Sequence, residues 1–356
     1  MDMNFSRESV FTTAVRMFLG AFFGIVGAFI AFGVMFGIFG FLKPTVVPER
    51  TTVTIAEDAN WSKKILPDSA PVILRIDING VIGVGKFKAK NVRAQLISAV
   101  DRYVDTKRMK GIFLVLDTPG GSAIDSNIIY ESILEFKERY NVPVFTYVEG
   151  MCASGGMYIA CASDKIYASS SAVIGSVGVR IGPVLGFTGL MNQYGVDAVT
   201  ITQGKFKDML NPTKPFDPRN YQSLTTLVKD DYEQFVDIVV KSRKKMSRER
   251  LVNEYGAQVY SVEKALNYGY IDYANMSYSQ ALTALTKAAG IPEDTKYQVV
   301  QLQTTNTLLK DLFEEESLLR KGKIVHTFSF PSQMDPELWN KVLYLYDPSA
   351  ESAAAE

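Results

Sequence analysis

Histidine is almost absent from this sequence, because the single example is His326. A Ser–His or Cys–His hydrolase would have to use that one residue, and a metal site made of several histidines is excluded. If the chain is an enzyme with an activated nucleophile, its base should be a residue of another type. We expect neither a metal nor a cofactor.

Cysteine is also scarce, and net charge is zero. Cys152 and Cys161 form no CxxC motif and cannot build a disulfide framework, so we interpret them as small buried apolar residues. A single bridge between them stays open. Lysine plus arginine number 38, as do aspartate plus glutamate. This balance gives no indication of a nucleic-acid partner.

One long uncharged run lies near the start of the sequence. Residues 17–42 contain no charged residue and are followed by Lys43. The run exceeds the roughly 20 residues that a helix needs to cross a bilayer. It is too long for the apolar part of a secretory signal, so it predicts a permanent transmembrane helix after a short tail, residues 1–16. Basic residues flank the run on both sides, so charge leaves its orientation open.

The rest of the sequence alternates between strand and helix patterns. Residues 43–69 contain several prolines and predict a linker, and residues 70–300 predict one α/β domain. Residues 301–356 show no clear architecture, and their small, acidic end predicts disorder. The expected strands are 72–78, 112–116, 142–148 and 198–202, and the expected helices are 91–104, 122–140, 154–162 and 219–246. Such alternation favours parallel strands joined by crossover helices.

Two glycine-containing segments follow expected strands. DTPGGS (residues 117–122) has two glycines, which allow a sharp turn and bring backbone N–H groups close to a ligand. A plain strand-to-helix turn explains it equally well. Ser154 begins the expected helix that follows the next strand. It is either a nucleophile beside backbone N–H groups or an ordinary N-cap.

A third segment, GKFKD (residues 204–208), contains two lysines. A lysine is normally protonated at neutral pH and cannot accept a proton. Burial beside apolar groups, here Phe206 and Met209, favours the neutral amine, which can act as a base. Loop lysines are more commonly solvated, so this segment alone predicts little.

Together these segments resemble a known family. DTPGGS, ASGGMYIA (153–160), IGSVGV (174–179) and GKFKDMLNP (204–212) follow the order and spacing of the signal peptide peptidase A family, also called protease IV, of the ClpP/crotonase superfamily. The resemblance covers about residues 70–275. It implies an α/β, ClpP/crotonase-like fold of stacked βαβ units, preceded here by a single transmembrane helix.

The resemblance also implies roles for individual residues. Ser154 falls on the nucleophile, Lys207 on the general base, and Ser176 on the serine that orients the lysine. Gly121 and Gly155 fall on the donors of the oxyanion hole. The reaction would be proteolysis by a Ser–Lys dyad, which agrees with the lack of histidine.

Some features depart from the family or stay open. Thr118 stands where the family usually has serine, and Met157 where an aromatic residue is common. Lys205 remains an alternative base. Only one ASGG and one GKFKD occur, so the chain holds a single catalytic unit, and by resemblance we expect a homo-oligomer.

The implied function is that of a membrane-anchored serine endopeptidase. Its substrates would be apolar peptides such as released signal peptides. It would lie in the bacterial inner membrane, with its catalytic domain on the extracytoplasmic side. Two alternatives are a non-catalytic membrane scaffold of the same fold and a crotonase-like acyl-CoA enzyme.

Overall fold

The computed structural model describes residues 15–27, 29–30, 50–305 and 342–346. The chain divides into two compact units, of which the first reaches to Arg50 and the second includes Thr51–Thr305. In the first unit, residues 15–27 and 29–30 are helical. Within the described ranges, no helix combines the length and the apolar character that crossing a membrane requires. The predicted anchor, residues 17–42, lies partly outside those ranges.

The second unit is built on a mixed sheet, which has eight strands in the described residues. These are β1 (Arg50–Ala56), β2 (Val72–Asn79), β3 (Met109–Thr118), β5 (Val144–Ala153), β6 (Lys165–Ala168), β7 (Val173–Gly175), β8 (Val259–Ser261) and β9 (Gln298–Thr305). Their order is β1-β9-β2-β3-β5-β7-β8, and β6 also pairs with β5. The pairs from β9 through β7 are parallel, and β8 runs antiparallel to β7. The predicted α/β organisation is confirmed.

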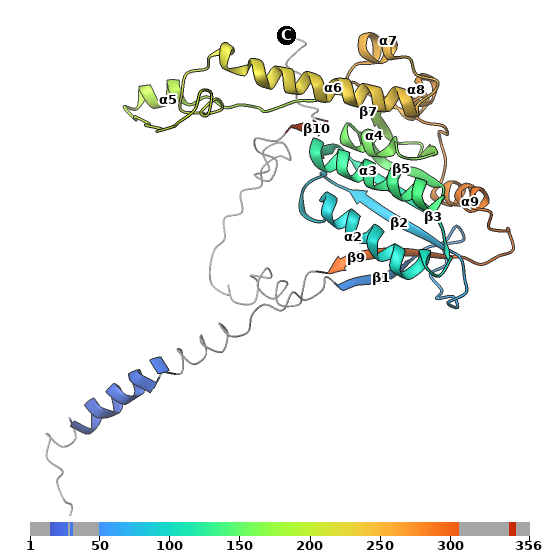
Figure 1. Ribbon diagram of the computed structural model, residues 1–356, viewed down its shortest axis with the longest axis horizontal. Helices are drawn as coiled ribbons and strands as arrows, with labels where there is room; N and C mark the ends of the chain where they lie inside the picture. Colours follow the sequence, from blue (N-terminus) through green and yellow to red (C-terminus); the bar gives the residue numbers. More distant parts are fainter. Residues whose placement is uncertain (1–14, 28, 31–49, 306–341, 347–356) are drawn as a thin grey trace, which may run out of the picture. The chain divides into compact units, whose positions relative to one another are not determined.

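Helices pack on both faces of the sheet. They include α2 (Ala89–Ala99), α3 (Ala123–Tyr140), α4 (Gly155–Ala160), α6 (Gln222–Ser242), α8 (Val262–Tyr268) and α9 (Tyr278–Ala288). Leu74 and Ile76 of β2 belong to the buried cluster that contains α2, α3, α4 and α6, whereas Ile73 packs with α9. Successive strand side chains point to opposite faces, which explains this division. Figure 1 shows α2, α3 and α4 lying in succession over the sheet.

Helix α3 illustrates how the local sequence determines these elements. The Ser122 side chain accepts a hydrogen bond from Asp125 N and caps the helix. Ile129, Ile133 and Phe136 follow at helical spacing and are buried. The helix ends where Asn141 adopts a left-handed conformation. Its bounds match the helix expected at residues 122–140.

The structure differs from the sequence prediction in the segment between β7 and α6. We call residues 181–217 the arm; it contains the short helix α5 (Thr188–Gln193) and extends past the sheet in Figure 1. The strand predicted at residues 198–202 is wrong. Val199 and Ile201 are 88% and 95% exposed, and the described part of the chain offers no neighbouring strand to pair with them.

Two further differences concern the expected linker and the C-terminal segment. Strand β1 lies within residues 43–69 and pairs with β9, so part of this range belongs to the sheet. Strand β9 continues past residue 300 and is parallel to β2. A short strand, β10 (Leu343–Leu345), pairs with β4 (Gly120–Ser122). Sequence patterns missed β9 and β10 because their partners are distant in sequence.

Candidate active site

Three of the predicted motifs emerge at one edge of the sheet. Strands β3, β5 and β7 are parallel neighbours, so the segments that follow them leave the sheet together. These segments are residues 117–122, 153–156 and 175–178. This is the carboxyl edge, where open α/β sheets bind their ligands. The fold thus gathers Gly121, Ser154 and Ser176 into one region.

Ser154 has a backbone conformation that residues with a side chain rarely adopt, with φ 53° and ψ −113°. Its N–H donates to the Gly175 carbonyl at 2.9 Å, which holds this conformation in place. The side chain makes no capping bond with α4; its Oγ donates to the Gly178 carbonyl at 3.5 Å. The N-cap interpretation is therefore wrong. Strained backbone of this kind is typical of functional positions.

Gly121 and Gly155 occupy positions where a side chain does not fit. A Cβ on Gly121, whose φ is 155°, would lie 2.1 Å from the carbonyl oxygen of Ile82. A Cβ on Gly155 would lie 2.5 Å from Ser126 Oγ. Glycine at position 121 lets the loop pack directly against the Ile82 backbone, and glycine at position 155 lets the start of α4 approach Ser126 of α3 closely.

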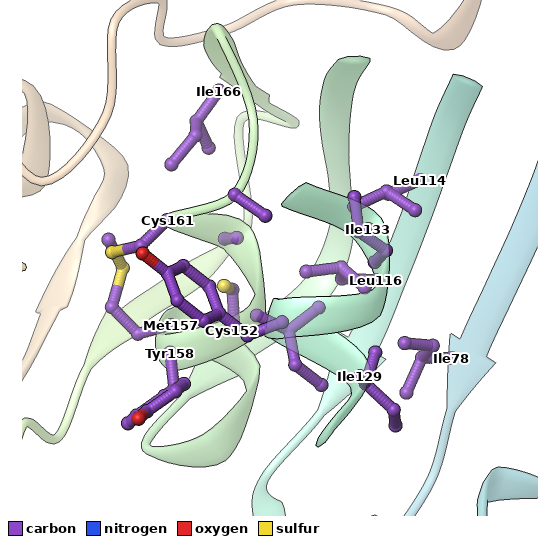
Figure 2. Packing of buried hydrophobic residues seen from close by; sticks show 14 of the residues in the cluster. Ile78, Leu114, Leu116, Ile129, Ile133, Cys152, Met157, Tyr158, Cys161 and Ile166 are labelled. Atoms are coloured by element: carbon purple, nitrogen blue, oxygen red, sulfur yellow. The ribbon is translucent and has the colours of Figure 1, made fainter. Parts of the chain in front are cut away.

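Thr118 and Met157, the two residues that depart from the family pattern, are both buried. The Thr118 hydroxyl donates to the Gly80 carbonyl at 2.6 Å and accepts from Gly120 N at 3.0 Å. A threonine hydroxyl thus closes this turn. Met157 is fully buried in α4, near Cys152 in Figure 2, and contributes to the core rather than to the site.

A segment of the chain itself lies in extended form along the glycine loop. Strand β10 is antiparallel to β4, and Tyr344 is opposite Gly121. On the other side of β10, Leu343 exchanges two backbone hydrogen bonds with Arg180, at 2.9 and 3.0 Å. Residues 343–345 therefore lie between two backbone segments. This is how peptide-binding proteins add an extended peptide to a sheet edge.

The register places the Tyr344 carbonyl beside both predicted oxyanion-hole glycines. Ala123 N–H donates to the Val342 carbonyl, and Tyr346 N–H donates to the Pro119 carbonyl. Hydrogen-bonded pairs alternate along an antiparallel ladder, so the intervening pair, Tyr344 with Gly121, is also of the hydrogen-bonded kind.

The second glycine lies close to the same carbonyl group. The Tyr344 oxygen is 3.2 Å from the point where a Cβ on Gly155 would be. One peptide carbonyl thus lies next to Gly121 and Gly155 together. Ser154, which precedes Gly155, is only 1% exposed.

Ser176 lies on the wall of a cavity of about 510 Å³. It has φ 54°, is 5% exposed, and its N–H donates to the Gln258 carbonyl at 2.7 Å. Arg180, Lys229 and Leu345 also line this cavity. The cavity therefore reaches β10 at Leu345.

Lys207 is not brought to this region within one chain. It lies in the arm with an exposed side chain, and no hydrogen bond joins it to Ser154 in the described residues. The expected burial beside Phe206 is not seen, because Phe206 is 48% exposed. Instead the Lys205 amine lies 4.9 Å from the centre of the Phe206 ring.

Lys229 is a residue that sequence reasoning missed. It lies on α6 and shares the cavity with Ser176. It occurs in an amphipathic helix with many charged neighbours, so no sequence signal separated it from a solvated residue. It is a second alternative to Lys207 as the base.

The described residues show no group of three or more His, Cys, Asp or Glu side chains that could hold a metal ion. Cys152 and Cys161 are free and buried, which confirms their interpretation as small core residues. Burial raises the pKa of the Cys152 thiol, so it is not a ready nucleophile at neutral pH.

The fold and the site define the class of the protein, an α/β protein whose candidate site lies at the carboxyl edge of its sheet. The profile of the Clp protease family matches residues 75–174, and that of Peptidase family S49 matches residues 137–292. The chain belongs to Peptidase family S49, and it is thus a serine peptidase that acts on peptide substrates.

Two relatives found by sequence agree with this assignment. A protein of Enterococcus faecium named as a signal peptide peptidase SppA is 30% identical over 254 residues, covering 69% of this chain and 70% of its own length. The chloroplastic serine protease SPPA of Arabidopsis thaliana is 27% identical, covering 62% of this chain and 32% of its own length. A ClpP1 mutant from Listeria monocytogenes overlaps 60% of this chain and 96% of its own, with a TM-score of 0.38 and 14% identity.

Proposed function

We propose that this protein is an endopeptidase that hydrolyses apolar peptides, such as released signal peptides, with Ser154 as nucleophile and Lys207 as general base. The observation that carries the proposal is the position of β10. An extended segment lies along Gly120–Ser122 with one carbonyl beside Gly121 and Gly155. A substrate peptide bound in the same way presents a carbonyl group to the residue that precedes Gly155, which is Ser154.

The proposed reaction uses the groups already described. Ser154 Oγ attacks the carbonyl carbon while its proton passes to the neutral Lys207 amine. The N–H groups of Gly121 and Gly155 stabilise the oxyanion of the tetrahedral intermediate. The lysine then gives the proton to the leaving amine, and an acyl ester remains on Ser154. Water, deprotonated by the same amine, hydrolyses this ester and regenerates the serine.

We place Lys207 at the site through assembly of several copies. The arm that contains it exposes many large apolar side chains to solvent: Val184, Leu185, Phe187, Leu190, Tyr194, Val196, Val199, Ile201, Phe206 and Phe216. An exposed apolar surface of this kind marks a protein or membrane contact. In a homo-oligomer, the arm of one copy would bring Lys207 to the Ser154 groove of the next, where Ser176 would orient the amine. Burial there favours the neutral form of lysine.

We assign the protein to the bacterial inner membrane, anchored by residues 17–42, with the catalytic domain on the extracytoplasmic side. The uncharged run supports the anchor. The apolar substrate class agrees with such a location.

The test is cleavage of a fluorogenic apolar peptide library by the full-length protein in detergent. Ser154→Ala and Lys207→Ala should abolish cleavage, whereas Lys205→Ala and Lys229→Ala should keep most of it. Loss of activity in Lys229→Ala but not in Lys207→Ala would move the base to α6. A wild-type protein that cleaves no peptide would favour the non-catalytic scaffold, and turnover of an acyl-CoA thioester would favour the crotonase-like alternative.

A further inference from the structure

Strand β5, which leads to the proposed nucleophile, has a bulge just before the site. Val148 of β5 pairs with Leu116 of β3, and the next pair joins Cys152 to Thr118. Between these two pairs β5 has three residues, whereas β3 has only one, Asp117. Across the bulge β5 also exchanges its other neighbour, β6, for β7. A bulge of this kind bends a strand and redirects the residues that follow it.

The bulge determines which residue of β5 reaches the glycine loop. If the pairing before the bulge continued in step, Cys152 would stand at the level of Gly120. Counting on from the observed pair of Thr118 with Cys152, Ser154 stands there instead. The two extra residues correspond to about 6–7 Å along a strand. In agreement with this register, Gly155 N is 2.7 Å from the point where a Cβ on Gly120 would be.

The side chain of Asp117 holds the bulge. Residues in a bulge lose part of their hydrogen-bond ladder. Here Asp117 Oδ1 accepts a hydrogen bond from Met151 N at 2.8 Å and so replaces a carbonyl of the neighbouring strand. The backbone carbonyl of Asp117 accepts from Gly80 N, just past the end of β2, at 2.9 Å. Asp117 thus ties the bulge of β5 to the ends of β2 and β3.

Gly150, inside the bulge, leaves room for this carboxylate. A Cβ on Gly150 would lie 2.5 Å from Asp117 Oδ1 and 2.9 Å from its Cγ. Gly150 is not among the residues with positive φ, so its backbone conformation is open to other residues. The contact with Asp117 is therefore the reason why this position requires glycine.

We propose that Asp117 and Gly150 are positioning residues, which place Ser154 at the glycine loop by holding the bulge of β5. This inference rests on the proposed function and deepens it. The segment from Met151 to Ser154 is short and paired with β7, so a shift of the bulge is passed on to the nucleophile. A nucleophile displaced by about 1 Å can lose much of its rate. Asp117 itself takes no part in proton transfer.

Cleavage of the fluorogenic apolar peptide by the full-length protein in detergent tests the carboxylate. Asp117→Ala removes the acceptor and should lower kcat about 10- to 100-fold. KM should stay within about threefold, because the loop that binds the peptide is unchanged. Asp117→Asn keeps an acceptor oxygen in place and should hold kcat within about threefold of wild type. In the control Asp58→Ala, which removes carboxylate bonds to Asn60 N and Ser62 N after β1, both constants should match wild type.

Gly150→Ala tests the other half of the contact. Its methyl group should displace the Asp117 carboxylate and lower kcat at least about tenfold. In a protein that already carries Asp117→Ala, the same change should lower kcat by less than about twofold more, because the contacted atoms are gone. If Asp117→Ala does not fold, Gly150→Ala still decides the question, since an unchanged kcat would overturn the inference.

Hydrogen exchange followed by mass spectrometry examines the bulge without reference to activity. The Met151 amide should exchange about tenfold faster in Asp117→Ala than in wild type, because it loses its acceptor. Asp117→Asn and Asp58→Ala should exchange at this position as wild type does.

The outcomes separate this inference from the proposed function. A wild-type kcat in Asp117→Ala, equal losses in Asp117→Ala and Asp117→Asn, or a loss confined to KM would overturn the positioning role. Faster exchange in Asp117→Ala together with full activity in Ser154→Ala would leave the bulge contact in place and remove the proposed nucleophile. Loss of activity in Ser154→Ala, with activity and exchange unchanged in Asp117→Ala, would do the reverse.

Discussion

Tyr344 is paired with Gly121 in antiparallel register, and its carbonyl oxygen lies beside Gly155. The two glycines come from separate loops at the carboxyl edge of the sheet, and the tyrosine comes from a segment far along the chain. One carbonyl group thus marks the point where these loops meet. Ser154, next in sequence to Gly155, is buried beside this point.

The first prediction follows from this occupancy. Because β10 and an added peptide would use the same backbone partners, the tail segment should compete with substrate at a high effective concentration. Tyr344→Asp places a charge against the rings of Tyr158 and Phe235 and should release β10. We expect kcat/KM for an added peptide to rise by about three- to tenfold. Tyr344→Phe keeps the ring and the backbone pairing and should stay within twofold of wild type. Equal activity of all three proteins in a fluorogenic assay would show that β10 does not block the groove.

The second prediction concerns the separation of Ser154 from Lys207. If each site takes its serine from one copy and its lysine from the next, mixing two inactive variants restores complete sites. Ser154→Ala and Lys207→Ala proteins, dissociated, mixed in equal amounts and reassembled, should recover about a quarter of wild-type activity. Each variant treated alone in the same way is the control. If the mixture stays inactive although subunit exchange is demonstrated by differently labelled copies, both residues of the dyad must belong to one chain.

Much of the fold could be predicted from local sequence patterns. The central strands β3 and β5 are nearly continuous buried apolar runs, as expected for parallel strands, and helices α2 and α3 bury one face at helical spacing. The strand predicted at residues 198–202 failed because alternating apolar residues form a strand only where a partner strand exists. Strands β9 and β10 were missed for the converse reason: their partners, β2 and β4, lie far away in sequence.

The candidate site, too, could be predicted only in part from the sequence. Ser154, Ser176 and the two glycines stand in short motifs after strands, and parallel neighbours carry such motifs to a common edge. The packing of Tyr344 against Tyr158 and Phe235 could not be predicted. Each of the three residues occupies an ordinary apolar position in its own segment. The run VLYLY at residues 342–346 is the one sequence signal of an extended apolar segment there.

The third prediction concerns a buried ion pair that joins the end of α6 to the sheet. Arg243, 5% exposed, donates to Asp272 Oδ2 at 2.9 Å, and the same oxygen accepts from Ile166 N of β6. Removing one partner of a buried pair leaves the other charge uncompensated. Asp272, however, is 24% exposed and keeps Lys165 at 3.5 Å, so Arg243→Met should lower the free energy of unfolding by about 2 kcal/mol in urea titrations, the cost of hydrogen bonds lost to a charged group. The exposed Arg248, which follows α6 and pairs with Glu233 and Asp237 of that helix, is the control. Arg248→Met should lower the free energy of unfolding by less than about 1 kcal/mol. Similar losses for both would show that the Arg243 pair has no special role.

The fourth prediction is a pH dependence of stability set by Glu57. Burial alone would raise the pKa of Glu57, but hydrogen bonds from its own backbone and from Arg75, at 2.6 Å, outweigh it and place the pKa below its ordinary value. A carboxyl group with a lowered pKa contributes stability above its unfolded pKa and loses that contribution as the pH falls through its folded pKa. Glu57→Gln should thus cost about 0.5–1 kcal/mol at pH 7.

The cost of Glu57→Gln should decrease as the pH falls below the ordinary glutamate value of 4.5 and approach zero once the pH passes the lowered folded pKa, where the wild-type carboxyl is protonated as well. Paired urea titrations of wild type and variant from pH 3 to pH 7 measure this difference directly. Glu135→Gln serves as the control, because Glu135 pairs with Arg139 on an exposed helix surface and should show little change at any pH. A Glu57→Gln cost that stays constant across the range would mean that lost packing, rather than the charge of the carboxylate, accounts for the destabilisation.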